Sequence, residues 1–176
     1  MREYMAKLNL KMSLFAVTIA LLSQSVIASV YYVAPNGNDA NVGSKEKPFA
    51  SLKKANSKVM AGDTVWVRGG TYMHTDTTYV KNDNMFAGIH LTKSGASDNN
   101  RIHYLAYPGE VPVFDFSKMP IANGSNNVRY TNGVLIQAQY LHLKGLEFKN
   151  VPMKGESNVG VYVSRSKHIF LELINS

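Results

Sequence analysis

Short runs of β-branched, aromatic and alternating apolar residues, separated by polar turns, recur along the chain from residue 30 onward. The first run, Val30–Val33, has the β-branched and aromatic side chains that strands prefer. The dense Asn/Gly/Asp segment 35–39 then signals a turn. Its side-chain oxygens are hard ligands that could also hold calcium. The spacing matches no complete calcium loop, so we expect a plain turn, which such residues satisfy with their own side chains.

A short amphipathic helix is expected after Lys47-Pro48-Phe49. Ser51 suits the N-cap position, and the residues that follow place an apolar side chain on one face at helical spacing. That face comprises Leu52, Ala55 and Val59. The lysines at 53, 54 and 58 fall on the opposite, solvated side, and Gly62 is expected to end the helix. A helix of this kind could cover the open end of a stack of strands.

Further strands are expected wherever apolar residues alternate between turn signals. They are Thr64–Arg68, Gly88–Leu91, Arg101–Tyr107, Val111–Phe116, Gly133–Ile136, Tyr140–Leu143, Leu146–Phe148, Gly160–Val163 and His168–Leu171. Gly69-Gly70 permits a sharp corner. The polar segments 73–86 and 121–132 are expected to be loops.

The last strands repeat at a fixed distance. Gly133 and Gly160 are 27 residues apart, and Tyr140 and His168 are 28 apart. A period in this range indicates a repeat array, and three short strands per repeat suit a three-sided coil that stacks its apolar side chains inward. A β-sandwich would also give many short strands, but not this regular restart. The pattern predicts an all-β, right-handed parallel β-helix with a short N-terminal capping helix.

Residues 1–28 have the pattern of a secretory signal peptide. Three basic residues come first: Arg2, Lys7 and Lys11. An apolar stretch, Ser13–Leu22, follows, and small residues before position 29 place cleavage between Ala28 and Ser29. The apolar stretch is too short for a membrane anchor. The chain has no cysteine, which excludes disulfides and a lipid-modified cysteine. We therefore expect a secreted, periplasmic or cell-surface protein without a stable membrane span, with residues 29–176 forming one domain.

The charge balance favours an acidic partner. The whole chain carries a formal net charge of +7, and removing the leader leaves 16 basic and 11 acidic residues, a net +5. Nucleic acid is excluded as a partner because an exported chain with scattered lysines does not form a basic stripe. We therefore expect an acidic polysaccharide as the partner and a monomeric protein. Solubility alone would also explain the positive charge.

Three blocks of sequence resemble the N-terminal part of family 9 polysaccharide lyases, the pectate lyase family. The blocks are YYVAPNGNDANVGSKEKPFASLKKA, AGDTVWVRGGTY and SGASDNNRIHYLAYPGEVPVFDF, followed by the repeat GVLIQAQYLHLKGLEFKNV. Together they cover nearly all of the chain from Tyr31 to Ser176. The first two blocks are typical of many secreted β-helices, whereas the third narrows the choice to polysaccharide lyases.

The resemblance implies calcium-assisted β-elimination of a pectate-like uronic-acid polymer. A calcium ion would stabilise the enolate-like intermediate, and a lysine kept neutral by its surroundings would remove the C5 proton. In the family, these residues lie in coils beyond the position that matches Ser176. The resemblance therefore places no catalytic residue, cofactor-binding residue or metal ligand in this chain. We expect an N-terminal fragment, incomplete at its C-terminus, that is inactive by itself.

The chemistry-bearing residues present show no such cluster. The aspartates are isolated and expected in turns or at the surface: Asp63, Asp76, Asp83, Asp98 and Asp115. The lysines near strand ends are expected to be solvated: Lys144, Lys154 and Lys167. The histidines lack metal-ligand spacing: His74, His90, His103, His142 and His168. Those at 90, 103 and 142 are expected to point outward from strands. Trp66 could stack on a sugar, but an aromatic residue between two valines more often packs.

Two alternatives share every block of sequence quoted above. One is a non-catalytic β-helix that binds glycans or acts as a surface adhesin. The other is a β-helix enzyme of different chemistry, such as a glycoside hydrolase with paired carboxylates or a lyase for another uronate polymer. Clustered aspartates with a lysine on neighbouring downstream coils would identify the lyase.

Overall fold

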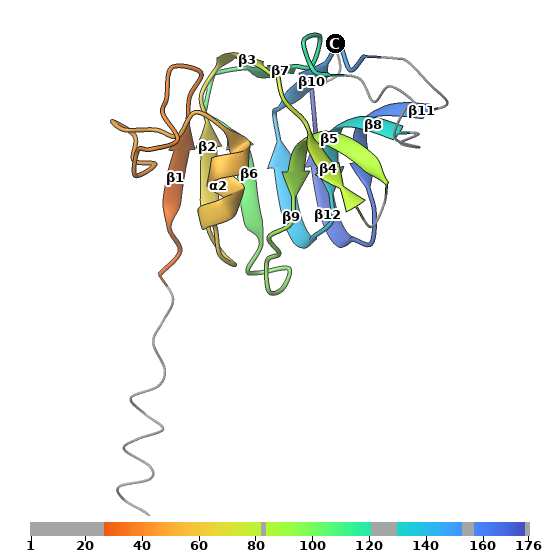
Figure 1. The fold of residues 1–176 in the computed structure, drawn as a ribbon. Helices are drawn as coiled ribbons and strands as arrows, with labels where there is room; N and C mark the ends of the chain where they lie inside the picture. The colour runs from red at the N-terminus through yellow and green to blue at the C-terminus, as the bar shows by residue number, and fades with distance from the viewer. Residues whose placement is uncertain (1–26, 82–83, 121–129, 153–156, 175–176) are drawn as a thin grey trace, which may run out of the picture.

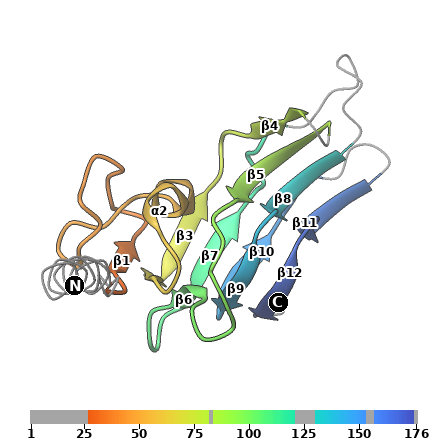
Figure 2. The same ribbon diagram turned by 90° about the horizontal axis from the view of Figure 1, so that it is seen from below.

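The chain winds into a stack of coils (Figures 1 and 2). The computed structural model describes residues 27–81, 84–120, 130–152 and 157–174. Most of the expected leader, together with Asp83 and Lys154, lies outside these ranges. Within them, no helix is both long and apolar enough to cross a membrane.

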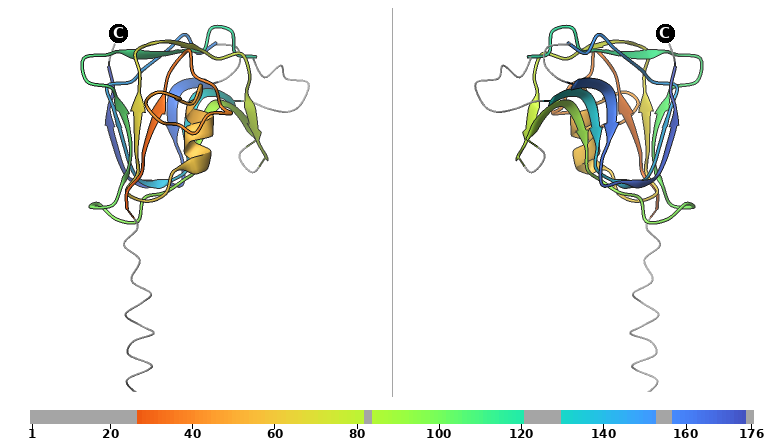
Figure 3. Two further views of the ribbon diagram at one scale, coloured as in Figure 1. Left: turned by 90° about the vertical axis from the view of Figure 1, so that its left-hand side faces the viewer. Right: turned by 90° about the vertical axis from the view of Figure 1, so that its right-hand side faces the viewer.

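The strands form three sheets. Sheet A contains β1 (Val30–Val33), β2 (Thr64–Val67), β6 (Ile102–Ala106), β9 (Gln139–Lys144) and β12 (Lys167–Glu172). Sheet B contains β3 (Gly70–Met73), β7 (Pro112–Asp115) and β10 (Glu147–Lys149). Sheet C contains β4 (Thr78–Val80), β5 (Met85–Leu91), β8 (Tyr130–Ile136) and β11 (Ser157–Val163). Seen along the stack, the sheets are the three sides of each coil (Figure 3).

From β5 onward the chain visits sheets C, A and B in turn, and each strand pairs in parallel with the strand one coil away. Crossovers between parallel strands are right-handed in nearly all proteins. The predicted right-handed parallel β-helix is therefore confirmed. The register also confirms the sequence repeat, because Val134 pairs with Val161 and Leu141 pairs with Ile169, at spacings of 27 and 28.

Two predicted loops were wrong in extent. The segment 73–86 contains β4, which pairs antiparallel with the start of β5. The segment 121–132 contains the first residues of β8, which begins at Tyr130. The second error arises because β8 continues through Thr131 and Asn132, polar residues that are nonetheless buried.

Apolar side chains stack from coil to coil in the interior. On sheet A, Val65, Tyr104 and Leu143 lie in register and are each 0% exposed. On sheet B, the Tyr72 ring stacks on Phe114 with centroids 4.7 Å apart, and Phe114 contacts Phe148 at 5.3 Å. Burying such side chains supplies roughly 25 cal/mol per Å² of apolar surface, the main stabilising term for a chain without disulfides.

Helix α2 (Leu52–Lys58) covers the first coil. Its N-cap is Ser51, as predicted, whose hydroxyl accepts from the Lys54 backbone N–H at 3.0 Å. The predicted apolar face is buried as well: Leu52, Ala55 and Val59 are at most 2% exposed. The helix ends at Lys58, earlier than the predicted stop at Gly62, because Val59 is already extended.

The turn before α2 has a structural role. The Asp39 carboxylate accepts from the backbone N–H groups of Ala50 and Ser51 at 2.8 and 3.0 Å, and from the Ser51 hydroxyl at 2.7 Å. These bonds fix the start of the helix. The segment therefore forms the turn that the sequence predicted.

Candidate functional site

A row of glycines bends sheet C. Gly88, Gly133 and Gly160 occupy the same place in β5, β8 and β11, between register pairs that flank them on both sides. A Cβ on Gly133 would lie 2.7 Å from the Gly160 carbonyl oxygen and 2.8 Å from a Val151 methyl, so the bend leaves no room for a side chain at position 133. The repeat of glycines seen in the sequence is therefore the mark of a stacked bend.

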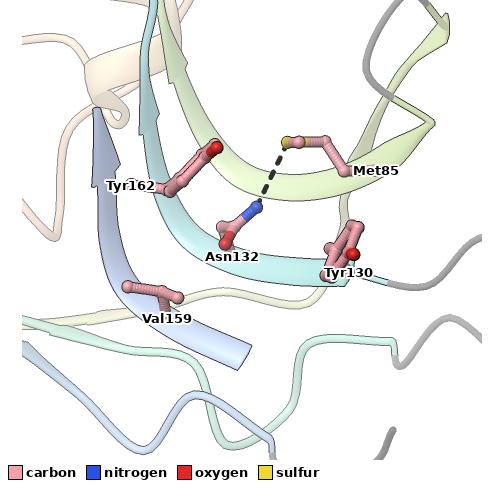
Figure 4. A pocket seen from close by; sticks show the side chains of 5 residues that line it. All are labelled: Met85, Tyr130, Asn132, Val159 and Tyr162. Carbon is pink, nitrogen blue, oxygen red and sulfur yellow. Dashed lines mark hydrogen bonds between the residues drawn. The ribbon is translucent and has the colours of Figure 1, made fainter. Parts of the chain in front are cut away.

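The bend changes which face the side chains occupy. After it, Ile89 and Val134 point into the interior core. Before it, Met85 and Ala87 pack with Leu135 in a separate cluster on the outer face. The strands therefore curve around a hollow on the outside of sheet C (Figure 4).

The hollow has a volume of about 270 Å³. Five side chains from three successive coils line it: Met85, Tyr130, Asn132, Val159 and Tyr162 (Figure 4). Tyr130 and Tyr162 are 37% and 40% exposed, so part of each ring is open to solvent. Aromatic rings beside a few polar groups are typical of small-ligand sites.

Asn132 is the polar group at the floor of the hollow. Its side chain is buried, with 2% of the residue exposed, and its amide nitrogen donates to the Met85 sulfur at 3.3 Å. Within the described ranges this is the one hydrogen bond of the side chain, and a thioether is a weak acceptor. Buried amides normally have full hydrogen-bond partners. Asn132 is therefore equipped to bind a hydroxyl or carboxylate of a ligand in the hollow.

The predicted aspartates do not gather at this site. Asp63 is buried in the turn just before β2, and Asp76 is exposed beside Lys53. Asp98 forms an ion pair with Arg101. The Asp115 carboxylate accepts a hydrogen bond from the Ser117 backbone N–H. Across the described residues, no group of three or more His, Asp or Glu side chains could hold a metal ion. The described carboxylates do not fit a calcium site.

The predicted lysines lie away from the hollow. Lys144 is exposed on sheet A and its ammonium lies 2.9 Å from the Glu172 carboxylate. Hydrogen bonds from Lys144 and His142 hold the pKa of Glu172 below its usual range. Lys167 is also exposed, at the start of β12. Both are solvated, as expected.

Two histidines form a pair that sequence spacing did not reveal. His103 and His142 are register partners on the outer face of sheet A, with Nδ1 atoms 3.2 Å apart. Burial lowers the pKa of His103, helped by the nearby His142 and Arg101. Neighbours in a solenoid are one coil apart in sequence, so short-range ligand motifs miss them. His90, also half-buried on an outer face, bonds Gln137 at 3.0 Å.

Trp66 packs against the protein. Its ring meets Tyr107 edge-on at 6.0 Å and 75°. The Arg68 guanidinium lies 4.7 Å above the same tyrosine ring and forms a bidentate pair with Glu110. The ring thus makes the packing contact that the sequence predicted for an aromatic residue between two valines, and it does not line the hollow on sheet C.

Sequence reasoning missed every residue of the hollow. Met85, Tyr130 and Asn132 fell in segments expected to be loops. The signal that could have found the members on β8 and β11 is the repeat, since an offset of 27 aligns Asn132 with Val159 and Leu135 with Tyr162, but this repeat does not reach Met85. These pairs belong to one surface only when the coils are stacked.

A model of the Pel9A-like right-handed β-helix region matches residues 31–176. Pectate lyase PEL9 of Emericella nidulans is 30% identical over 162 residues, which cover 89% of this chain and 35% of that protein. Pectate lyase L of Paenibacillus polymyxa is 31% identical over 85% of this chain and 28% of its own length.

Two solved structures are similar to the described fold. A rhamnogalacturonan lyase superimposes with a TM-score of 0.58 at 32% identity, over 68% of this chain and 28% of that one. Pectate lyase Pel9A superimposes with a TM-score of 0.50 at 28% identity, over 70% and 29%. The chain spans about a third, or slightly less, of the length of these relatives. Because the family model matches nearly the whole chain, the protein belongs to the Pel9A-like right-handed β-helix family.

Proposed function

We propose that this chain forms the N-terminal cap and first coils of a secreted polysaccharide lyase that acts on a pectate-like uronic-acid polymer. The observation that carries the proposal is the hollow on sheet C, where two exposed tyrosines surround the under-bonded amide of Asn132. The names of the relatives support the same substrate class.

The hollow has the chemistry for a sugar ring. The open parts of the Tyr130 and Tyr162 rings offer apolar contact area with a polar hydroxyl at the edge. Asn132 adds a buried donor and acceptor at the floor. The net charge of +5 after the leader favours an acidic polymer over a neutral one.

The described residues contribute binding rather than bond cleavage. β-Elimination needs a base to remove the proton α to the uronate carboxylate. None of the described lysines is buried, and the described carboxylates form no cluster that could hold calcium. We expect the base lysine and the calcium ligands in further coils, so this chain alone is expected to bind the polymer without cleaving it.

Calorimetric titration with an oligogalacturonate tests the binding. Tyr162→Ala is expected to weaken binding about fivefold to tenfold, because it removes half of the aromatic wall. Tyr79→Ala is the matched control, since Tyr79 is an exposed tyrosine of the same sheet that does not line the hollow. Equal losses in the two variants, or equal affinity for a neutral galactan, would contradict the proposal.

The assay for cleavage is the absorbance of the unsaturated product from polygalacturonate with calcium. We expect no turnover from this chain alone, and clear turnover would show that the chemistry lies within it. Rhamnogalacturonan is the second substrate to titrate, because the structure with the TM-score of 0.58 is a rhamnogalacturonan lyase of 32% identity. Tighter binding of rhamnogalacturonan would move the proposal to that polymer.

The alternative function is a non-catalytic glycan-binding protein. It would use the same hollow, so binding data alone do not separate the two. The coding DNA after codon 176 does, because a lyase needs clustered aspartates and a lysine on neighbouring coils. A continuing reading frame with neither would favour the binding protein.

A further inference from the structure

Asp63 is a buried carboxylate that the proposed function does not use. It lies in the turn between α2 and β2, and 2% of the residue is exposed. In the parts of the chain that the structure describes, no cationic side chain forms an ion pair with it. A carboxylate withdrawn from water without a compensating positive charge is costly.

Two backbone N–H groups reach the Asp63 carboxylate. The Met60 N–H donates to Oδ2 at 2.7 Å, within the turn itself. The Ser29 N–H donates to Oδ1 at 2.7 Å, from a position far away in sequence. The Ser29 carbonyl in turn accepts from the Thr64 N–H at 2.9 Å, which begins the pairing of β1 with β2.

Ser29 is also the residue that the leader pattern places first in the mature chain. The two residues before it are open to solvent, with Ile27 87% exposed and Ala28 exposed as well. The exposed peptide bond and the buried carboxylate therefore meet at one nitrogen atom. This coincidence links two observations made independently, one from the leader pattern and one from the folded coil.

We propose that cleavage after Ala28 creates an α-ammonium group on Ser29 that forms a partly buried ion pair with Asp63, making Asp63 the receptor for the mature N-terminus. In the cleavage step, water adds across the Ala28–Ser29 amide. The C–N bond breaks, Ala28 leaves as a carboxylate, and the Ser29 nitrogen ends as –NH₃⁺.

The new charge strengthens a contact that already exists. The Ser29 nitrogen is already at hydrogen-bond distance, so no rearrangement is needed to form the pair. Before cleavage the carboxylate accepts from a neutral N–H group, and after cleavage it faces a positive charge, so Coulomb attraction is added to the hydrogen bond. Because this contact begins the pairing of β1 with β2, removal of the leader would stabilise the first coil, which α2 covers.

Intact mass spectrometry of the protein secreted from the complete coding sequence is the first test. We expect the mature chain to begin at Ser29. A start at any other residue overturns the proposal, because the α-amino group would then lie at least one residue away from Asp63.

A double-mutant cycle is the second test. One change inserts an alanine between Ala28 and Ser29, with cleavage before the inserted residue checked by mass. This keeps the Ser29 N–H but moves the charge outward. The other change is Asp63→Asn. We expect the insertion to lower the folding equilibrium constant about tenfold with Asp63 present, and by far less with Asn at position 63.

Asp76→Asn is the matched control, because Asp76 is a surface carboxylate with a 70% exposed side chain. The insertion should have its full effect in that background. If Asp63 only caps the Met60 turn, the insertion and Asp63→Asn will instead be additive, and that result overturns the proposal.

A pH series needs no Asp63 variant and remains informative if Asp63→Asn fails to fold. A free α-amino group loses its proton near pH 8, and pairing holds the proton to higher pH. The native protein should exceed the inserted protein in free energy of unfolding by its full margin at about pH 6, and this margin should be lost by about pH 11.

The titratable groups near this pair do not confuse the series. They are Tyr104, which faces Asp63, and His103 and Arg101, whose backbones bond the turn. Burial raises the pKa of Tyr104, and all three groups are common to the native and inserted proteins. A difference that does not change with pH would overturn the ion pair.

Discussion

The rings of Tyr140 and His168 stack with centroids 4.5 Å apart and planes inclined by 19°. Both residues also hold a positive φ, 54° and 55°, at the corner where the chain passes from sheet C to sheet A. A left-handed backbone costs a non-glycine residue about 1–2 kcal/mol. Its recurrence at the same place in two coils indicates that the corner is a repeated structural element, stabilised by the stack.

Substitutions at Tyr140 should separate the contribution of its backbone conformation to stability from the contribution of ring stacking. Tyr140→Asn and Tyr140→Val both remove the ring, but asparagine tolerates a positive φ and a β-branched residue does not. We expect the valine variant to be less stable than the asparagine variant by about 1–2 kcal/mol. Urea unfolding measures the difference, and a valine variant as stable as the asparagine variant would contradict the left-handed corner.

The glycine row makes a second prediction about the bend of sheet C. Gly133→Ala should cost about 1–3 kcal/mol, because the new methyl group meets the Gly160 carbonyl and a Val151 methyl within 3 Å. Gly160→Ala is the control, since a Cβ there meets nothing within 4 Å. In thermal unfolding, Gly133→Ala should have the lower midpoint temperature and Gly160→Ala the higher one. Loss of oligogalacturonate binding in Gly133→Ala alone would further link the bend to the hollow.

The fold could be predicted because its signals are local or periodic. Ser51 is followed by an apolar face at helical spacing, and Gly133 and Gly160 mark the coil length directly. The strand boundaries in sheet C could not be predicted, because Asn132 and Thr131 are polar yet buried within β8. Tertiary packing overrides strand propensity there.

The candidate site was beyond reach for a different reason. Its members come from three coils, and no two of Met85, Asn132 and Tyr162 are close in sequence. Their proximity depends on the parallel register, which a sequence period indicates for the later coils only. The earlier coils differ in length, with Met85 paired to Tyr130 at an offset of 45, so no fixed repeat extends to β5.

A third prediction concerns pH. His74 stacks on Phe116 at 4.7 Å, and this burial lowers its pKa despite the opposing effect of Asp76. The unfolded chain therefore binds a proton near pH 6.5 that the folded chain does not. Stability should be full above about pH 7, fall as pH drops through that range, and level off below the folded pKa.

His74→Gln should flatten this part of the stability curve, measured by urea unfolding at about pH 7 and pH 5. His103 also has a lowered pKa, so His103→Gln should remove a separate share. The pKa of Glu110 is lowered by Arg68, so Glu110 affects the pH dependence of stability only below about pH 4.5, outside the range of about pH 5 to 7 that is measured. An unchanged slope in His74→Gln would show that folding does not lower the pKa of His74.

The fourth prediction distinguishes packing from sugar binding at Trp66. Trp66→Phe should lower stability by about 1 kcal/mol, because the smaller ring loses part of the edge contact with Tyr107. Its affinity for oligogalacturonate should equal that of the unmodified chain. A clear loss of affinity without loss of stability would instead assign a sugar contact to sheet A.

The last prediction concerns calcium. Three described aspartates that are buried or half-buried already accept from protein N–H groups: Asp39 from Ala50, Asp63 from Ser29 and Asp115 from Ser117. A cation that binds only the folded state raises the unfolding temperature with its concentration. We therefore expect neither added calcium nor a chelator to move the unfolding midpoint of this chain, with magnesium as the control cation. A calcium-dependent rise that magnesium does not reproduce would reveal a site within the chain, and would transfer to these coils the metal chemistry that we assign to further ones.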